Sequence, residues 1–213
     1  MRRFLNAGSA DIIVSVSASI VENKAYLSEI DGKIGDGDHG VNMAKGFGRC
    51  AERLNGTETL DQAMNLLSDI LLTEIGGSMG PLYGSMFMDM AEMVEDAEYI
   101  DAPLFGQMLD AGIASISDIG SAKLGDKTML DTFIPAARAF NEAVAQSKSF
   151  PQALASMQDA AERGRDSTID LVAKVGRAAR LGERSRGVLD AGATSCCIIL
   201  AGLGQGVAPR LVD

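Results

Sequence analysis

The chain has 213 residues, of which 46% are hydrophobic and 23% charged, which suits one compact domain with a sizeable buried core. It carries 19 Lys and Arg against 29 Asp and Glu, a formal net charge of −10, so nucleic-acid binding through phosphate neutralisation is not expected. A basic partner or a bound cation fits this charge better. With no Trp, 24 Gly and 11 Met, the composition favours packed helices over a β-sandwich.

The cysteines and the apolar stretches bear on where the chain resides. Cys50, Cys196 and Cys197 lack the spacing of a disulfide framework, which suits a reducing cytosol. The basic residues at the N-terminus are not followed by the long apolar region of a signal peptide. The densest apolar stretch, residues 196–203, is far shorter than the ~20 residues that a membrane-spanning helix needs. We therefore expect a cytoplasmic protein with no membrane-spanning segment.

Helical periodicity recurs along most of the chain. Ile13, Val16 and Ile20 are spaced by three and four residues, which places them on one face of a helix. The alternation at residues 14–17 is the only passage typical of a strand, and its neighbours keep the helical period. The predicted helices span residues 9–28, 39–54, 60–75, 80–96, 103–119, 128–146, 151–175 and 190–208.

Most connections between these helices are short and contain helix breakers, so consecutive helices should pack as antiparallel neighbours. No repeat or flexible linker divides the chain. The sequence therefore predicts an all-α fold, a single domain over residues 1–213 built as an up-and-down antiparallel barrel or bundle of about eight helices. Four connections are rich in glycine and charge, and because they follow the odd-numbered helices they should share one end: residues 31–42, 76–80, 120–128 and 177–192.

The first of these connections carries three carboxylates within eight residues. Asp31, Asp36 and Asp38 are separated by glycines that let them converge, and Mg²⁺ prefers such oxygen ligands. A calcium EF-hand is excluded because Val41 stands where that loop needs glycine, and the dinucleotide-binding pattern that starts at Gly35 lacks a preceding strand. Carboxylates oppose a bound phosphate unless a cation lies between them. The loop therefore predicts a metal site that can hold phosphate, with a solvated acidic turn as the alternative.

The other three connections also suit ligand binding. Residues 76–80 offer backbone N–H groups before a helix start, which suits an anion, although a helix C-cap with a tight turn explains them equally. Asp126 or Thr128 can cap the next helix. The last connection gathers several arginines and has the length of a lid. His39 is the only histidine, and beside aspartates it suits capping or ligand contact better than general-base work.

Taken together and in this order, four motifs resemble the L subunit of dihydroxyacetone kinase. They run along the whole chain at matching separations: Asp31-x4-Asp36-x-Asp38-His39-Gly40-x-Asn42, Gly76-Gly77-Ser78-Met79-Gly80, Gly125-Asp126-Lys127-Thr128-Met129, and Leu181-Gly182-Glu183-Arg184-Ser185 with Asp190-Ala191-Gly192-Ala193-Thr194-Ser195. The resemblance implies an all-α barrel of eight helices, which agrees with the helices predicted above. Met79 departs from the family, which usually has a small hydroxyl residue there, so one side-chain contact to phosphate is expected to be missing.

By the same resemblance, Asp31, Asp36 and Asp38 would bind two Mg²⁺ ions that hold the phosphates of ADP or ATP. No catalytic side chain is implied beyond these metal ligands. The residues implied to contact the nucleotide are His39, Gly40, Val41, Asn42, Ser78 and Met79 on the phosphate side, and Gly120, Met129, Arg177, Asp190, Ala191 and Gly192 around the nucleoside.

The resemblance also implies an activity and its partners. The chain would be a phosphotransferase subunit that carries the phosphoryl donor, while a separate K-type subunit holds the ketose, dihydroxyacetone by default and erythrulose as an alternative. A stand-alone L chain is typical of the arrangement in which a phosphohistidine protein of the phosphotransferase system rephosphorylates bound ADP, and an ATP-using pair is the other arrangement. A nucleotide-sensing regulatory subunit and a metal-dependent phosphohydrolase are further alternatives, although the sequence offers no clear water-activating base for hydrolysis.

Overall fold

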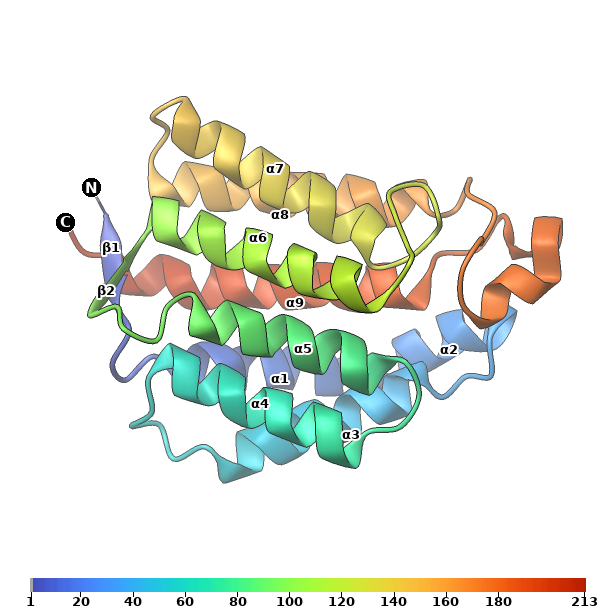
Figure 1. The fold of residues 1–213 in the computed structure, drawn as a ribbon, viewed down its shortest axis with the longest axis horizontal. Coiled ribbons are helices and arrows are strands. Elements are labelled where there is room, and N and C mark those ends of the chain that lie inside the picture. The colour runs from blue at the N-terminus through green and yellow to red at the C-terminus, as the bar shows by residue number, and fades with distance from the viewer. Residues whose placement is uncertain (1) are drawn as a thin grey trace.

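The computed structural model describes residues 2–213, and helices dominate this range (Figure 1). The α-helices are α1 (Asp11–Glu22), α2 (Lys24–Ile34), α3 (His39–Arg53), α4 (Leu60–Glu74), α5 (Met79–Glu92), α6 (Ala102–Ile119), α7 (Leu130–Ala145), α8 (Phe150–Ser167) and α9 (Ala191–Val207). The other elements are the strands β1 (Arg3–Leu5) and β2 (Tyr99–Asp101) and the 3-10 helices η1 (Arg177–Ser185) and η2 (Ala208–Arg210). The predicted all-α class is confirmed.

Eight of these helices form a closed ring. α1, α3, α4, α5, α6, α7, α8 and α9 each pack against the next, and α9 packs back against α1. Neighbouring helices run in opposite directions, as the connections between them require (Figure 1). α2 continues beyond one end of the ring, where it packs on α3 and on η1. The predicted antiparallel barrel of eight helices is therefore present, with α2 as an addition to it.

Small residues let α9 close the ring against α1. A Cβ at Gly202 would lie 2.9 Å from the side chain of Val16, and one at Gly206 would lie 3.0 Å from the side chain of Ile12. Both α1 residues are fully buried. Because added side-chain atoms would collide here, the glycines allow the first and last helices of the chain to approach closely.

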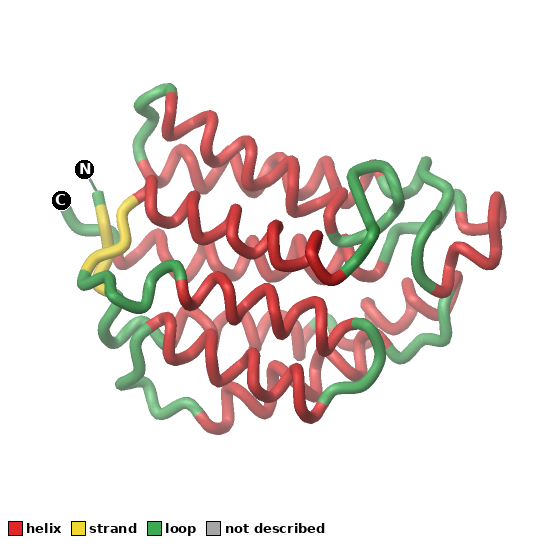
Figure 2. The backbone as a smooth tube through the Cα atoms, viewed as in Figure 1, coloured by secondary structure: helices red, strands yellow, loops and turns green. Residues whose placement is uncertain are grey.

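The two ends of the barrel differ in what they carry. One end holds both described chain ends and the small sheet, in which Phe4 of β1 pairs antiparallel with Ile100 of β2 (Figure 1). The connections that follow α2, α4, α6 and α8 all lie at the opposite end (Figure 2). These are the four glycine-rich and charged connections, so the prediction that they share one end is confirmed.

The predicted first helix over residues 9–28 was wrong, because the chain breaks into two helices. The backbone leaves helical geometry at Asn23 (φ −87°, ψ 9°), whose side-chain amide donates to the carbonyl oxygen of Ser19 at 2.9 Å. This bond caps the end of α1 and lets α2 start in a new direction. α2 then extends to Ile34, so Asp31 lies in its last turn and not in a loop as predicted.

The predicted helix over residues 151–175 was too long, because α8 ends at Ser167. The backbone then turns, with the N–H of Ile169 donating to Asp166 and that of Leu171 donating to Thr168. The predicted loop beyond it contains η1, which the hydrophobic pattern did not indicate. The remaining predicted helices agree with the structure to within about four residues at each end.

One helical stretch in the described residues, Ala191–Arg210, is long and apolar enough to cross a membrane by length and composition. It consists of α9 continued by η2, and so exceeds the apolar stretch 196–203 considered from the sequence. Within its most apolar window, 67% of the residues are buried inside the protein. Its apolar character is explained by its contacts with α1, α7 and α8 in the ring.

Candidate functional site

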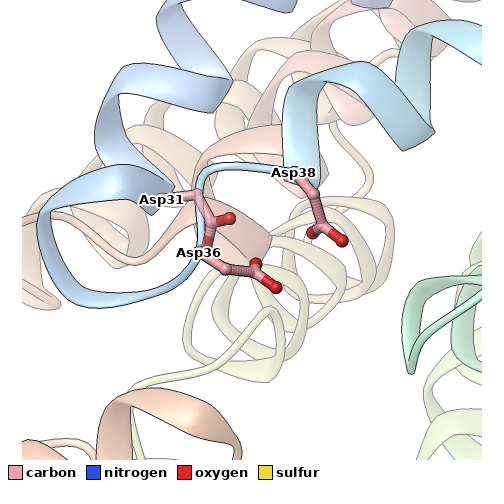
Figure 3. A group of neighbouring side chains, drawn as sticks. All are labelled: Asp31, Asp36 and Asp38. Carbon is pink, nitrogen blue, oxygen red and sulfur yellow. The ribbon is translucent and has the colours of Figure 1, made fainter.

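Three aspartates converge at the end of the barrel that carries the charged connections (Figure 3). Asp31 comes from the last turn of α2, Asp36 from the short connection after it, and Asp38 from the residue before α3. One carboxylate oxygen from each lies within 4.8 Å of the other two. Asp36 and Asp38 are exposed and Asp31 is half-buried, so the group is open to solvent.

Local backbone geometry brings these carboxylates together. Gly35 sits against the Asp31 carboxylate so closely that any Cβ at this position would collide with it. Gly37 has φ +78°, in the left-handed region that favours glycine. Gly40, in the first turn of α3, lies on the backbone at the start of α2, where a Cβ would collide with the Lys24 carbonyl and with Ser28. Glycine is therefore needed at 35 and 40 to fold α2 back onto α3.

The carboxylates keep lone pairs free for a ligand. Asp38 precedes α3 but makes no side-chain capping hydrogen bond. Asp31 accepts a 3.2 Å hydrogen bond from the backbone N–H of His39. Asp36 forms an ion pair with Arg177 at the start of η1, which joins the long connection to the aspartate loop. Three oxygen donors in this arrangement fit a hard cation such as Mg²⁺, which also removes their mutual repulsion.

The connection between α4 and α5 supplies a helix start to the same end of the barrel. Ser78 is exposed and makes no side-chain cap, and Gly77 has φ +77°. Met79 belongs to the hydrophobic core, so its side chain packs inward, away from solvent. Gly80 lies on the carbonyl groups at the end of α4, where a Cβ would collide with Ile75 and Leu71.

A third helix start comes from α9. The Asp190 carboxylate accepts a 2.8 Å hydrogen bond from the N–H of Ala193 and so caps the helix. Burial raises the pKa of Asp190 to about 6, although the Ala193 N–H and the nearby Lys127 ammonium act in the opposite direction. Asp190 is therefore a structural cap, and Ala191 and Gly192 form the first turn of the helix behind it.

The Gly125–Asp131 segment is held by a buried lysine. Lys127 is 1% exposed, and its Nζ donates to the carbonyl oxygens of Thr168 at 2.6 Å, Val188 at 2.6 Å and Leu171 at 3.2 Å. Burial lowers the pKa of Lys127, and the Asp190 carboxylate opposes this shift. The lysine thus ties both ends of the long connection to the one between α6 and α7.

The predicted cap at Thr128 agrees with the structure, because its hydroxyl accepts from the N–H of Leu130, the first residue of α7, at 3.2 Å, whereas the alternative at Asp126 was wrong. Asp131, inside α7, accepts from the N–H of Thr128 at 2.8 Å and from the N–H of Gly125 at 2.6 Å. Asp126 instead accepts from the N–H of Lys123 at 3.0 Å. Asp131, the second residue of α7, thus satisfies N–H groups that precede the helix, while the Thr128 hydroxyl satisfies the first N–H inside it.

His39 is buried, and its Nε2 lies 2.9 Å from Oγ of Ser195. Burial lowers the pKa of His39 to about 4, although the Asp31 carboxylate raises it, so the imidazole is neutral at pH 7. Ser195 lies in turn 2.7 Å from the hydroxyl of Tyr83. The sequence indicated His39. It gave no signal for Tyr83, which is a single polar residue in the apolar helix α5. Ser195, a single polar residue in the apolar helix α9, appeared only within a motif.

The structure brings the residues indicated by the sequence to one end of the barrel. Those of the aspartate loop and of the start of α3 form one continuous group, in which Val41 is exposed and Asn42 half-buried. Arg177 contacts this group through its ion pair with Asp36. Gly120 ends α6 as an exposed residue, and Met129 is buried just before α7.

Comparisons with known proteins agree with this architecture. The DAK2 domain family matches residues 33–205. The chain is 35% identical to the ADP-binding subunit DhaL of PEP-dependent dihydroxyacetone kinase 2 from Listeria innocua, covering 89% of each chain. It is 36% identical to the ADP-binding subunit DhaL of PEP-dependent dihydroxyacetone kinase from Escherichia coli, covering 82% of this chain and 84% of that one.

A solved structure shares the fold. The crystal structure of the dihydroxyacetone kinase from C. freundii in complex with AMP-PNP and Mg²⁺ superposes with a TM-score of 0.71 at 26% identity, covering 92% of this chain. The present chain spans 33% of that longer kinase chain. The family match covers most of the sequence, and the DhaL relatives are matched over most of their own length. The chain therefore belongs to the DAK2-domain family, among the DhaL-type subunits of dihydroxyacetone kinases.

Proposed function

We propose that residues 1–213 form one DhaL-type domain that binds Mg²⁺ and a nucleotide at the charged end of the barrel and takes part in phosphoryl transfer to a short-chain ketose. The observation that carries this proposal is the convergence of three carboxylates where α3, α5 and α9 begin. The printed names of the two DhaL relatives, ADP-binding subunits of PEP-dependent dihydroxyacetone kinases, support the nucleotide and the reaction.

In this proposal Asp31, Asp36 and Asp38 hold two Mg²⁺ ions, as the family resemblance implies. Mg²⁺ bound there supplies the positive charge that lets phosphate oxygens approach the aspartates and that offsets charge on the transferring group. The acceptor hydroxyl of the ketose displaces the nucleotide's terminal phosphoryl group, so no phosphorylated side chain of this chain is required.

The starts of α3 and α5 provide the remaining phosphate contacts. Backbone N–H groups at the first turn of a helix are free and carry partial positive charge, which favours anions. Ser78 adds a hydroxyl and Met79 only its N–H, because its side chain is in the core. The residues proposed around the nucleotide are His39, Gly40, Val41, Asn42, Ser78 and Met79 at the phosphates, and Gly120, Met129, Arg177, Asp190, Ala191 and Gly192 at the nucleoside.

The printed names of the same relatives support a partner and a donor. A separate K-type subunit would present the ketose, and a phosphohistidine protein would rephosphorylate bound ADP, since both named relatives are PEP-dependent and of similar length. These reactions place the protein in the cytoplasm. A nucleotide-sensing regulatory subunit is the second candidate, because a site that binds nucleotide can report nucleotide state without transfer.

The first experiment identifies what the protein carries. The protein is purified without added nucleotide and denatured, and the released nucleotide and metal are quantified by mass spectrometry. We expect stoichiometric ADP and about two Mg²⁺ per chain if ADP is a retained coenzyme. An empty protein that binds ATP reversibly supports an ATP-using pair, and a protein that binds neither nucleotide contradicts the proposal.

A matched pair of variants then tests the metal site. Asp36→Asn should abolish Mg²⁺-dependent ADP binding without unfolding the chain, because Asp36 is exposed and pairs only with Arg177. Asp69→Asn, at an exposed position of α4, removes the same charge away from the site and should bind normally. Normal transfer by Asp36→Asn would refute the metal site, and activity reconstituted with a ketose-binding subunit would exclude a purely regulatory role.

A further inference from the structure

Three buried polar side chains form a chain of hydrogen bonds at the charged end of the barrel. His39 Nε2 lies 2.9 Å from Ser195 Oγ, which lies 2.7 Å from the Tyr83 hydroxyl. Both hydroxyls also lie 3.1 Å from the carbonyl oxygen of Gly192. The exposed fractions are 7% for His39, 0% for Ser195 and 1% for Tyr83, so water has little access to any of them. Their polar atoms therefore depend on one another for hydrogen bonding.

These side chains come from helices that are not neighbours in the ring. α4 lies between α3 and α5, and α1 lies between α3 and α9. Across the ring, α3 and α5 touch through the rings of Phe47 and Phe87, whose centroids lie 5.9 Å apart, and the hydrogen-bond chain adds a polar link that also includes α9. The hydrogen-bond chain crosses the barrel end and joins all three near the points where they begin.

Each of the joined helices begins with one part of the proposed nucleotide site. The aspartate loop leads into α3, the Gly76–Ser78 turn leads into α5, and Asp190 leads into α9. We propose that Ser195 and Tyr83 are positioning residues, which hold His39 and the start of α3 in a fixed place relative to the starts of α5 and α9. This inference rests on the proposed function, because it assigns both hydroxyls to the site that binds Mg²⁺ and nucleotide.

The number of available protons selects one tautomer of His39. Each hydroxyl can donate once, and the carbonyl oxygen of Gly192 can only accept. If Tyr83 donates to Ser195 and Ser195 donates to Gly192, then Nε2 of His39 must carry the proton that it donates to Ser195. This arrangement satisfies one more contact than the one in which Ser195 donates to His39. The hydrogen-bond chain therefore predicts the Nε2–H tautomer of His39, which leaves Nδ1 as an acceptor.

Removing either hydroxyl should weaken ligand binding more than its effect on stability explains. Ser195→Ala and Tyr83→Phe each delete one oxygen atom and keep the rest of the side chain. Ser68→Ala is the matched control, because the Ser68 hydroxyl is also buried and donates to the carbonyl oxygen of Gly84 at 2.7 Å, between α4 and α5. It removes a comparable bond without contact to His39.

Affinity and stability are measured side by side on the full chain. Calorimetry gives the Kd for ADP in the presence of Mg²⁺, and thermal unfolding gives the Tm. We expect Ser195→Ala and Tyr83→Phe to raise Kd by about three- to tenfold, the equivalent of one hydrogen bond, while Ser68→Ala lowers Tm similarly and leaves Kd unchanged. Equal Kd values for all four proteins would overturn the positioning role.

The single histidine gives a second readout, and its measurement on the wild type does not require any variant to fold. Nitrogen-15 NMR of histidine-labelled wild-type protein reports one imidazole, that of His39. The proposal expects the Nε2–H tautomer in the wild type and a mixture of tautomers in Ser195→Ala. The Nδ1–H tautomer, or a mixture in the wild type, would overturn it. Failure of the wild type to bind ADP would instead refute the proposed function, and the two failures are therefore distinguishable.

Discussion

Lys127 offers the sharpest test of how the site end of the barrel is held together. Its buried ammonium group donates to three backbone carbonyl oxygens, two just after α8 at Thr168 and Leu171 and one just before α9 at Val188. Lys127→Met keeps an unbranched apolar side chain of similar length and removes all three bonds. The connection that contains η1 would then lose the Lys127 bonds at both of its ends.

The expected cost follows from the burial of the three acceptors. A hydrogen bond to a charged group contributes about 1.5–3 kcal/mol, but the desolvation free energy of the buried ammonium group offsets part of this contribution. Thr168 is fully buried, whereas Leu171 and Val188 are partly exposed and can bind water instead. We therefore expect Lys127→Met to lose about 2–4 kcal/mol, which lowers the Tm of a chain of this size by roughly 4–16 °C.

The assay combines thermal unfolding with hydrogen exchange, and Lys174→Met is its control. Lys174 bridges the same two connections, through Asp126 at 3.2 Å, but its side chain is 61% exposed, so its loss should cost less than about 1 kcal/mol. Amide exchange should accelerate over residues 168–190 in Lys127→Met before the rest of the barrel opens. A Lys127→Met protein no less stable than Lys174→Met would refute this account.

Three further predictions concern packing, pH and ligand. In α3, Gly40→Ala should destabilise the fold by about 1–3 kcal/mol, because the added Cβ collides with the α2 backbone. Gly48→Ala in the same helix should stabilise the fold by about 0.5–1 kcal/mol, because the nearest atom to its Cβ is in Val21 at 3.6 Å. Urea unfolding measures both changes. Since the folded pKa of Asp190 is raised to about 6, its proton favours folding at low pH and this contribution is lost as the pH rises through about 6. The free energy of unfolding of the wild type should therefore decrease as the pH rises from about 4 to 6, and this decrease should be smaller in Asp190→Asn. ADP with Mg²⁺ at ~100 times Kd should raise the Tm by about 5–10 °C, and EDTA should reverse the gain.

The parts that the sequence could predict are those encoded locally. Asp31, Asp36 and Asp38 lie within eight residues and are separated by glycines, so their convergence followed from a short stretch of chain. The helix order and the shared end of the four connections followed from the 3.6-residue period and from short links. The roles of individual residues at the nucleotide stay predictions, because no bound ligand tests them.

The parts that the sequence did not reveal depend on contacts between distant residues. Lys127 appeared as an ordinary cation next to a capping residue, and its acceptors lie more than 40 positions away. Ser195 and Tyr83 are single polar residues in apolar helices, which local periodicity does not distinguish from tolerated core hydroxyls. The break at Asn23 left the hydrophobic period nearly unchanged, so α1 and α2 were predicted as one helix.

The electrostatics of the site make metal and nucleotide dependent on each other. A carboxylate about 4 Å from a phosphate opposes it by about 4 kcal/mol at an effective dielectric constant near 20, whereas a helix start favours an anion by only about 0.3–1 kcal/mol. The helix starts at the proposed phosphate site therefore do not offset the three aspartates, and the net charge of −10 adds to the repulsion. If the phosphates lie there as proposed, nucleotide binding requires a cation, and by linkage the nucleotide must strengthen cation binding by the same factor. Measuring the Kd for ADP across a series of Mg²⁺ concentrations tests this reciprocity, and an affinity independent of Mg²⁺ would show that the aspartates lie outside the phosphate site.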